Sequence, residues 1–140
     1  MIGGMAMASH QRLNPGGLFD SASWGYHQVQ VSTGQRIIHF AGQGALDTAA
    51  NVIGVGDFRA QMSACLTNID IACRAAGVTR GDIAMLRLYV VNHQPDDIPV
   101  MIELLTGFFG QDATPPATLL GVACLAMPDM MIEIEAVAVG

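Results

Sequence analysis

The stretch PPATLLGVACLAMPDMMIEIEAVAVG, residues 115–140, decides the fold, because it ends in a strongly patterned apolar run that carries two carboxylates. Glu133 and Glu135 stand among Met, Ile, Ala and Val side chains. Removing a carboxylate from water is costly unless a partner or a function compensates for it. On a strand, residues two apart share one face. The sequence therefore predicts a strand with both glutamates on one side.

Short alternating or apolar runs at both ends of the chain predict two β-hairpins. Residues 118–125 and 130–139 read as two strands joined by the MPD turn. Near the N-terminus, residues 26–32 alternate between valine and glutamine, and the Thr-Gly pair that follows leads into a second run over residues 36–42. Alternation bounded by turn residues is typical of hairpin strands.

The middle of the chain predicts two helices and one further strand. Residues 57–76 place apolar side chains at three- and four-residue steps and precede Gly77, and a second helix is expected from about Asp97 to Phe109. Residues 82–91 are rich in β-forming side chains. The order hairpin, helix, strand, helix, hairpin predicts an α+β fold with two helices on one face of a sheet.

The length and composition indicate one domain that buries much of its surface against other subunits. The chain has 140 residues, and we expect a single domain over 1–140 with a loosely ordered segment at 1–15. Hydrophobic residues make up 51% of the chain and charged residues only 13%. This is less polar side chain than the surface of a monomer normally carries, so we expect an oligomer.

Charge and residue usage exclude several classes of function. The formal charge of −6 should repel phosphate backbones, so nucleic acid is not an expected partner. All six cationic residues are arginines. Because the chain has no lysine, it cannot form a Schiff base through one, which excludes aldolase-type and pyridoxal-lysine mechanisms.

No pattern in the chain predicts a metal, a cofactor or a membrane segment. The histidines lack metal-ligand spacing. Arg87 and Glu103 interrupt the longest apolar runs, and the N-terminus does not read as a secretory signal. Three cysteines, an odd number without CxxC spacing, fit a reducing compartment. We therefore expect a cytoplasmic protein with neither metal nor cofactor.

Several short motifs, taken in order, resemble the Rid proteins, also called the YjgF-like or reactive intermediate/imine deaminase family and labelled L-PSP endoribonucleases. The resemblance runs from about Tyr26 to Val139. It rests on the order and spacing of GYHQ at 25–28, FAGQGALD at 40–47, AAGVTRGDIA at 75–84, FFG at 108–110, PPAT at 115–118 and IEIEAVAV at 132–139.

The resemblance implies a chorismate-mutase-like fold, assembled as a homotrimer around a central β-barrel, with small-molecule clefts between subunits. It also implies site residues. Glu133 matches the glutamate that activates water, and Tyr26, Gly42 and Gln43 match residues that line the pocket. Thr118 stands where deaminases of the family have the arginine that binds the substrate carboxylate.

The missing arginine argues against ordinary deamination of 2-imino acids, because a threonine hydroxyl cannot reproduce a bidentate guanidinium. We expect instead an enzyme that hydrolyses, deaminates or tautomerises a neutral or weakly polar imine, enamine or related carbonyl compound, with Glu133 as base. The alternative is a non-catalytic ligand-binding or interaction protein that kept the trimer. Glu133 itself reads either as a pocket carboxylate or as a structural ion pair, and Glu135 is expected to be structural.

Overall fold

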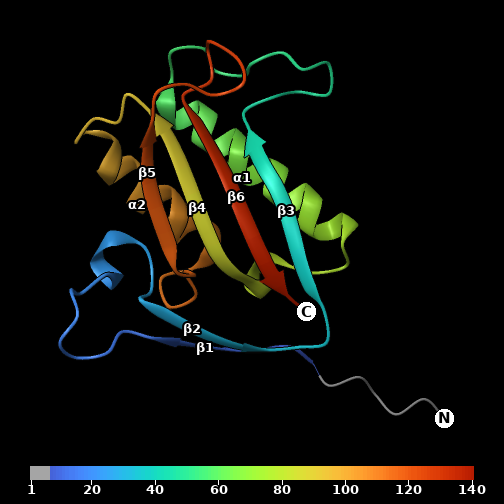
Figure 1. Ribbon diagram of the computed structural model, residues 1–140, viewed down its shortest axis with the longest axis vertical. Helices are drawn as coiled ribbons and strands as arrows, with labels where there is room; N and C mark the ends of the chain where they lie inside the picture. Colours follow the sequence, from blue (N-terminus) through green and yellow to red (C-terminus); the bar gives the residue numbers. More distant parts are fainter. Residues whose placement is uncertain (1–6) are drawn as a thin grey trace.

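The computed structural model describes residues 7–140, which form one four-stranded mixed sheet, a separate two-stranded ribbon and two main helices (Figure 1). The four-stranded sheet has the order β3-β6-β4-β5, in which β4 and β5 are parallel and the other pairs antiparallel. Its strands are β3 (Ile37–Gly44), β4 (Ile83–Val91), β5 (Ala117–Val122) and β6 (Ile132–Val139).

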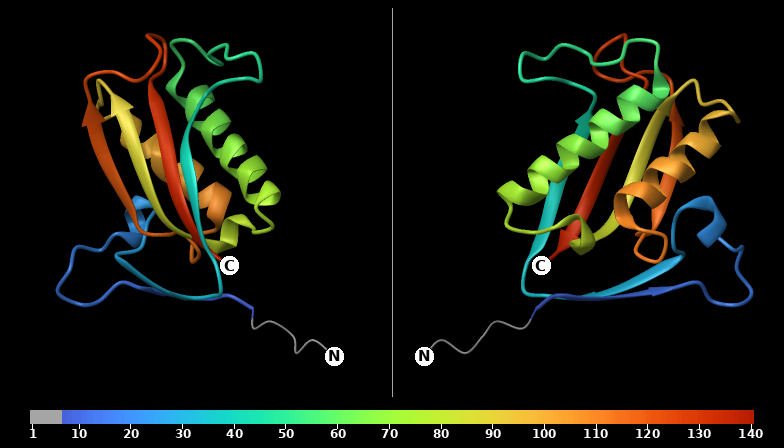
Figure 2. Two further views of the ribbon diagram at one scale, coloured as in Figure 1. Left: turned by 45° about the vertical axis from the view of Figure 1, so that its right-hand side comes forward. Right: turned by 180° about the vertical axis from the view of Figure 1, so that it is seen from behind.

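Both main helices lie against the same face of this sheet (Figure 2). They are α1 (Phe58–Ala75), capped at its start by the Asp57 side chain on the Ala60 N–H, and α2 (Asp97–Phe109), which ends at Gly110. The predicted α+β fold, with two helices on one face of the sheet, is thus confirmed, and the sheet is mixed.

The core forms where α1 packs on the central strands. Met62, Leu66 and Ile69 of α1 are buried as their periodicity predicts, and they join the alternate side chains of β6 that begin with Ile132 and Ile134. Burial of these apolar side chains is the main contribution to stability. The alternation of β6, buried at every second residue, leaves both glutamates on the opposite face.

The predicted N-terminal hairpin is wrong. β2 (Val29–Thr33) does not pair with β3 but forms an antiparallel ribbon with β1 (Ser9–Leu13), which crosses one end of the sheet (Figure 1). The inward face of β2 is polar, so it does not extend the apolar sheet; Gln30 donates to the Ile83 carbonyl instead. The loosely ordered segment expected at 1–15 thus contains a strand, and its first six residues lie outside the described part.

The predicted C-terminal hairpin is also wrong, because β5 and β6 are not neighbours. β4 lies between them and pairs with both. Leu86, Leu88 and Val90 of β4 are buried, so this strand takes a central position with a neighbour on each side. The connection from β4 to β5 runs through α2, a parallel crossover that local turn signals do not reveal.

The ribbon is fixed to the start of β4 by polar contacts. The His10 ring lies between the Ser32 hydroxyl at 2.9 Å and the Asp82 carboxylate at 3.1 Å. Arg12 donates to the Gly81 carbonyl at 3.1 Å. Gly81 and Asp82 belong to the short helix η2 (Arg80–Asp82) that precedes β4. These contacts hold β1 and β2 against the main sheet although the two sheets share no ladder.

The face of the sheet opposite the helices, here called the open face, has no other element of residues 7–140 packed over it (Figures 1 and 2). Ile37, His39 and Ala41 of β3 are exposed there, and Leu120 of β5 is 36% exposed. An uncovered face of this length with apolar side chains is uncommon in a monomer.

Candidate functional site

The two glutamates of β6 occupy the open face but have different surroundings. Glu135 accepts hydrogen bonds from the Tyr89 hydroxyl and, at 3.0 Å, from the Arg87 guanidinium. The bond from Tyr89, followed by that from Arg87, lowers the pKa of Glu135 below its usual range. The same bond to Glu135 is the main cause that raises the pKa of Tyr89. Glu135 is therefore an ionised carboxylate held by two neighbours.

Glu133 forms no side-chain hydrogen bond with any of residues 7–140, although it is half-buried. Its carboxylate lies over Gly42 of β3: a Cβ added at Gly42 would sit 2.5 Å from Glu133 Oε1. A Cβ there would push the Glu133 carboxylate aside, so only glycine leaves the carboxylate in this position. The structure thus brings together Glu133 and Gly42, and the Glu133 carboxylate has no hydrogen-bond partner in the described part of the chain.

Gly42 lies in a β-bulge. The pairing of β3 with β6 shifts between Phe40 and Gln43, so Ala41 and Gly42 have no partner in the register. A bulge leaves backbone groups without ladder bonds and is common beside active sites. The Gln43 side chain donates back to the Ala41 carbonyl at 3.1 Å. Together with Glu133, the bulge offers a base next to unpaired backbone at one edge of the sheet.

Thr118 is on β5, the opposite edge strand, where it is exposed and shares the open face. In the parallel register it lies directly opposite Arg87, which in turn lies opposite Glu135 on β6. An arginine is therefore present one strand away from Thr118, the residue that matches the family's arginine position. Its guanidinium is already engaged by Glu135.

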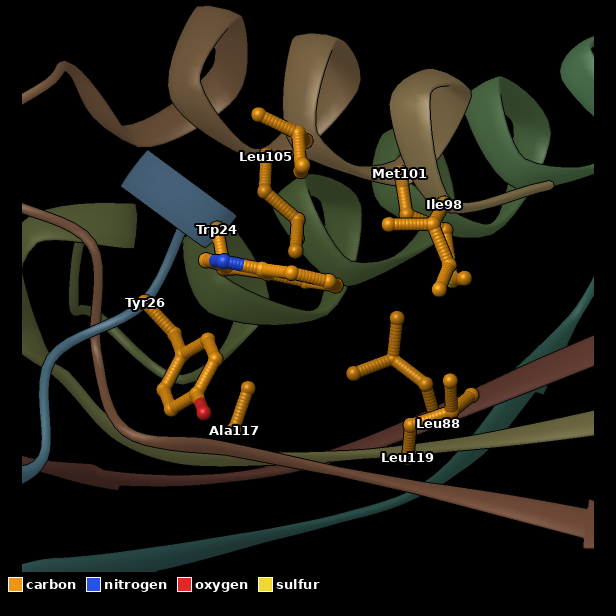
Figure 3. Close-up of a pocket in the computed structure, with 9 residues that line it drawn as sticks. Trp24, Tyr26, Leu88, Ile98, Met101, Leu105, Ala117 and Leu119 are labelled. Carbon is orange, nitrogen blue, oxygen red and sulfur yellow. The ribbon is translucent and has the colours of Figure 1, made fainter. Parts of the chain in front are cut away.

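Tyr26 lies on the other side of the sheet from Glu133. Its ring faces a cavity on the helix side, beside Trp24 and Ala117 (Figure 3). Ala117 and Thr118 are consecutive on β5 and point to opposite faces. Within one subunit, Tyr26 does not share a pocket with Glu133.

The expected site residues thus form two groups at opposite edges of the sheet. Glu133, Gly42 and Gln43 gather at the β3–β6 edge, and Thr118 and Tyr26 lie at the β5 edge. Two interstrand spacings, about 10 Å, separate β5 from β6. A single subunit does not bring the two groups into contact.

Sequence reasoning missed Arg87 and Tyr89. Both alternate with the buried Leu86 and Leu88, and this alternation was a signal that they share one face of their strand. The sequence does not show which strand pairs with β4, so the contact of Arg87 and Tyr89 with Glu135 was not predictable.

The described part of the chain holds no cluster of three or more His, Cys, Asp or Glu side chains that could bind a metal. Cys65 and Cys73 are buried core residues, and burial is the main cause that raises the pKa of Cys65 to about 12. No helix among residues 7–140 is both long and apolar enough to cross a bilayer.

Comparison with known proteins identifies a matching family model and a relative in sequence. A family model described as Endoribonuclease L-PSP matches residues 21–140. A RutC family protein of Pyrococcus horikoshii is 30% identical over 101 residues, which cover 72% of this chain and 77% of that protein.

Solved structures resemble the chain over most of its length. YyfB from Yersinia pestis, a protein of unknown function of the conserved Rid family, is 32% identical with a TM-score of 0.86, covering 94% of this chain and 98% of that one. E. coli TdcF, solved with bound serine, is 25% identical with a TM-score of 0.64, covering 74% of this chain and 80% of that one.

Proposed function

The chain belongs to the endoribonuclease L-PSP family, the Rid or YjgF proteins, and we propose that it is an enzyme that acts on an uncharged imine, enamine or related carbonyl compound, with Glu133 as base. Family membership supports a role with small molecules in general. The reaction that the protein catalyses and the roles of its site residues are proposed.

The observation that carries the proposal is the difference between Glu133 and Glu135. Glu135 already accepts two hydrogen bonds, so it has a structural role. Glu133 has no partner among residues 7–140 and stands over the bulge at Gly42. A half-buried carboxylate without a partner is costly, and binding a water or substrate that donates to it offsets this cost.

The chemistry follows from this placement. Glu133 accepts a proton from a water molecule as the water oxygen attacks the imine carbon, and its return to nitrogen completes a neutral carbinolamine. Glu133 then accepts the hydroxyl proton of the carbinolamine and passes it to nitrogen as the C–N bond breaks, so that imine and water yield a carbonyl compound and ammonia. Unpaired backbone amides at the Gly42 bulge are placed to bind the polarised group. The same base serves tautomerisation of an enamine.

The split of the site residues between two sheet edges supports a ring of subunits. A two-fold dimer brings identical edges together, whereas a closed head-to-tail ring places the β5 edge of one subunit against the β3 edge of the next. Only the second arrangement unites Thr118 with Glu133 and Gly42 in one cleft. We therefore propose a homotrimer with intersubunit clefts. The contribution of Tyr26 to this cleft stays a prediction.

The charges on the open face support an uncharged substrate. Thr118 brings no cation, and the guanidinium of Arg87 is neutralised by Glu135. With Glu133 also present, a substrate carboxylate would meet more negative than positive charge. The serine bound in TdcF is an amino acid, and the same ligand class would lack a free cationic partner here.

The proposal is tested with imines that an oxidase generates in the reaction mixture. A flavin amine oxidase converts an α-methyl-substituted primary amine to a ketimine, and semicarbazide traps the imine faster than the product ketone. The proposal predicts that this protein lowers the rate of semicarbazone formation, and that it does so less for a 2-imino acid made by an amino-acid oxidase. Equal rates with and without the protein would contradict an imine hydrolase.

The absence of a cation at Thr118 also favours the alternative, a binding protein that has lost turnover. Calorimetric titration with the product ketone separates the two. Binding without any effect on semicarbazone formation would assign the protein to the non-catalytic class.

A further inference from the structure

An apolar cavity of about 210 Å³ lies on the helix side of the sheet, between α2 and the β4–β5 edge. Helix α2 contributes Ile98, Met101 and Leu105 to its walls, and the sheet contributes Leu88, Ala117 and Leu119. Figure 3 shows the indole ring of Trp24 extending between Leu105 and Ala117, with the Tyr26 ring beside it. The cavity lies on the other side of β5 from Thr118 and the open face, although Tyr26, a predicted residue of the cleft, borders it.

The wall formed by Trp24 is fixed in place by the backbone that follows it. The short helix η1 (Ala22–Trp24) ends at Gly25, which has a φ of 84°. A Cβ at Gly25 would lie 3.2 Å from the Ile102 Cα, so glycine lets this segment approach α2 closely. The indole also packs edge to face on Phe19, with ring centroids 5.5 Å apart.

The lining has two polar groups, the Tyr26 hydroxyl and the Trp24 indole N–H. Neither forms a hydrogen bond within residues 7–140, and the lining carries no charged side chain. Trp24 remains 43% exposed and Leu119 39% exposed, so the cavity opens to the surface between large apolar side chains. A ligand there would cover these side chains and offer an acceptor to the free hydroxyl.

We propose that this cavity binds a small, uncharged, planar ring compound that carries one hydrogen-bond acceptor. An apolar cavity of roughly 150 Å³ stays dry and takes up benzene, so the volume here suffices for a six-membered ring with a small substituent. A charged ligand is disfavoured, because it would lose hydration without gaining a counter-charge. The aromatic walls favour a flat ring, and Tyr26 selects the acceptor.

Titration of the full chain with acetophenone tests the proposal. Trp24 is the only tryptophan, so its fluorescence reports on the cavity, and calorimetry supplies the affinity. We expect saturable binding of acetophenone, binding of ethylbenzene weaker by about 2–10-fold for the lost hydrogen bond, and the weakest binding for benzoate. Tyr26→Phe should remove the preference for acetophenone and leave the affinity for ethylbenzene unchanged.

Filling the cavity provides the decisive variants. Ala117→Leu should abolish binding of both neutral probes, whereas Leu120→Val, on the same strand but facing the other side, should leave binding unchanged. If Ala117→Leu does not fold, Leu119→Phe at the more exposed wall provides the same test. A fluorescence change that does not saturate, or equal binding by the filled variants, would overturn the proposal.

Discussion

Arg87 and Thr118 face each other across the parallel pair β4–β5, and both project onto the open face of the sheet. The chain therefore has an arginine beside the position where the resemblance places the family's arginine, but the guanidinium is bound by Glu135 at 3.0 Å. A neutral ion pair thus lies beside the expected place of a free cation, and this difference is the basis of the proposed substrate class.

Thr118→Arg should create activity toward 2-imino acids. The new guanidinium would be free, because Glu135 is already bound to Arg87 and Tyr89. We expect at least about a tenfold faster hydrolysis of an aliphatic 2-imino acid in the semicarbazide competition assay, since charged bidentate contacts contribute roughly 1.5–3 kcal/mol. Thr118→Lys keeps the charge without the fork and should gain less. An unchanged rate in the arginine variant would show that Thr118 does not lie in the cleft.

The oligomeric state tests the argument from opposite sheet edges. Light scattering across the micromolar range should give three times the chain mass of 14.7 kDa. A monomer mass would mean that the two groups of site residues stay apart. A dimer mass would indicate that two identical sheet edges pair with each other. Either result would rule out the proposed cleft.

Glu135→Gln should destabilise the assembly far more than an exposed pair would. If the open face is covered by other subunits, losing the carboxylate leaves Arg87 buried without a partner, which costs about 3–5 kcal/mol and lowers the Tm by roughly 6 °C or more. Glu103→Gln is the matched control: its 2.7 Å pair with Arg59 is exposed, so the Tm should change by less than about 2 °C. Equal shifts in both variants would indicate that the open face is not covered.

The attachment of the N-terminal ribbon should weaken in acid. Burial, the largest single influence, raises the pKa of Asp82, but the hydrogen bonds from Thr79 and then His10 outweigh it and lower the pKa overall. A carboxyl group with a lowered folded-state pKa stabilises the fold above its unfolded pKa of about 3.9, and this stability is lost as the pH falls through the folded value.

Urea unfolding at fixed protein concentration measures this effect. Asp82→Asn should be less stable than the natural chain by about 1 kcal/mol at pH 7, and the difference should disappear by about pH 3. A difference that is the same at both pH values would show that the Asp82 charge does not hold the ribbon.

The helices were predictable because their signals are local. The three- and four-residue spacing of Met62, Leu66 and Ile69, with Gly77 beyond, marks α1 without reference to the rest of the chain. Strand partners are a different matter, since a strand's neighbour depends on which faces are buried in the whole sheet. Both hairpins were wrong for this reason: a polar β2 turned away from the sheet, and β4 came between β5 and β6.

The candidate site was predictable only in part, for the same reason. The carboxylates of Glu133 and Glu135 stand out in an apolar run, and their common face follows from strand parity. The bonds that distinguish them come from Tyr89 and Arg87, 46 and 48 residues before Glu135 along the chain, through a strand register that no local pattern contains. The cytoplasmic location stays a prediction.

The most direct test of the account is the rate of ketimine hydrolysis by Glu133→Gln, measured on protein of confirmed oligomeric mass. Glutamine keeps the shape of the side chain over Gly42 and removes the base. The account predicts a rate lower by a factor on the order of 10²–10⁴, with mass and Tm close to those of the natural chain. Unchanged hydrolysis, or loss of the assembly in Glu133→Gln while Glu135→Gln abolishes hydrolysis, would contradict the assignment of the two carboxylates.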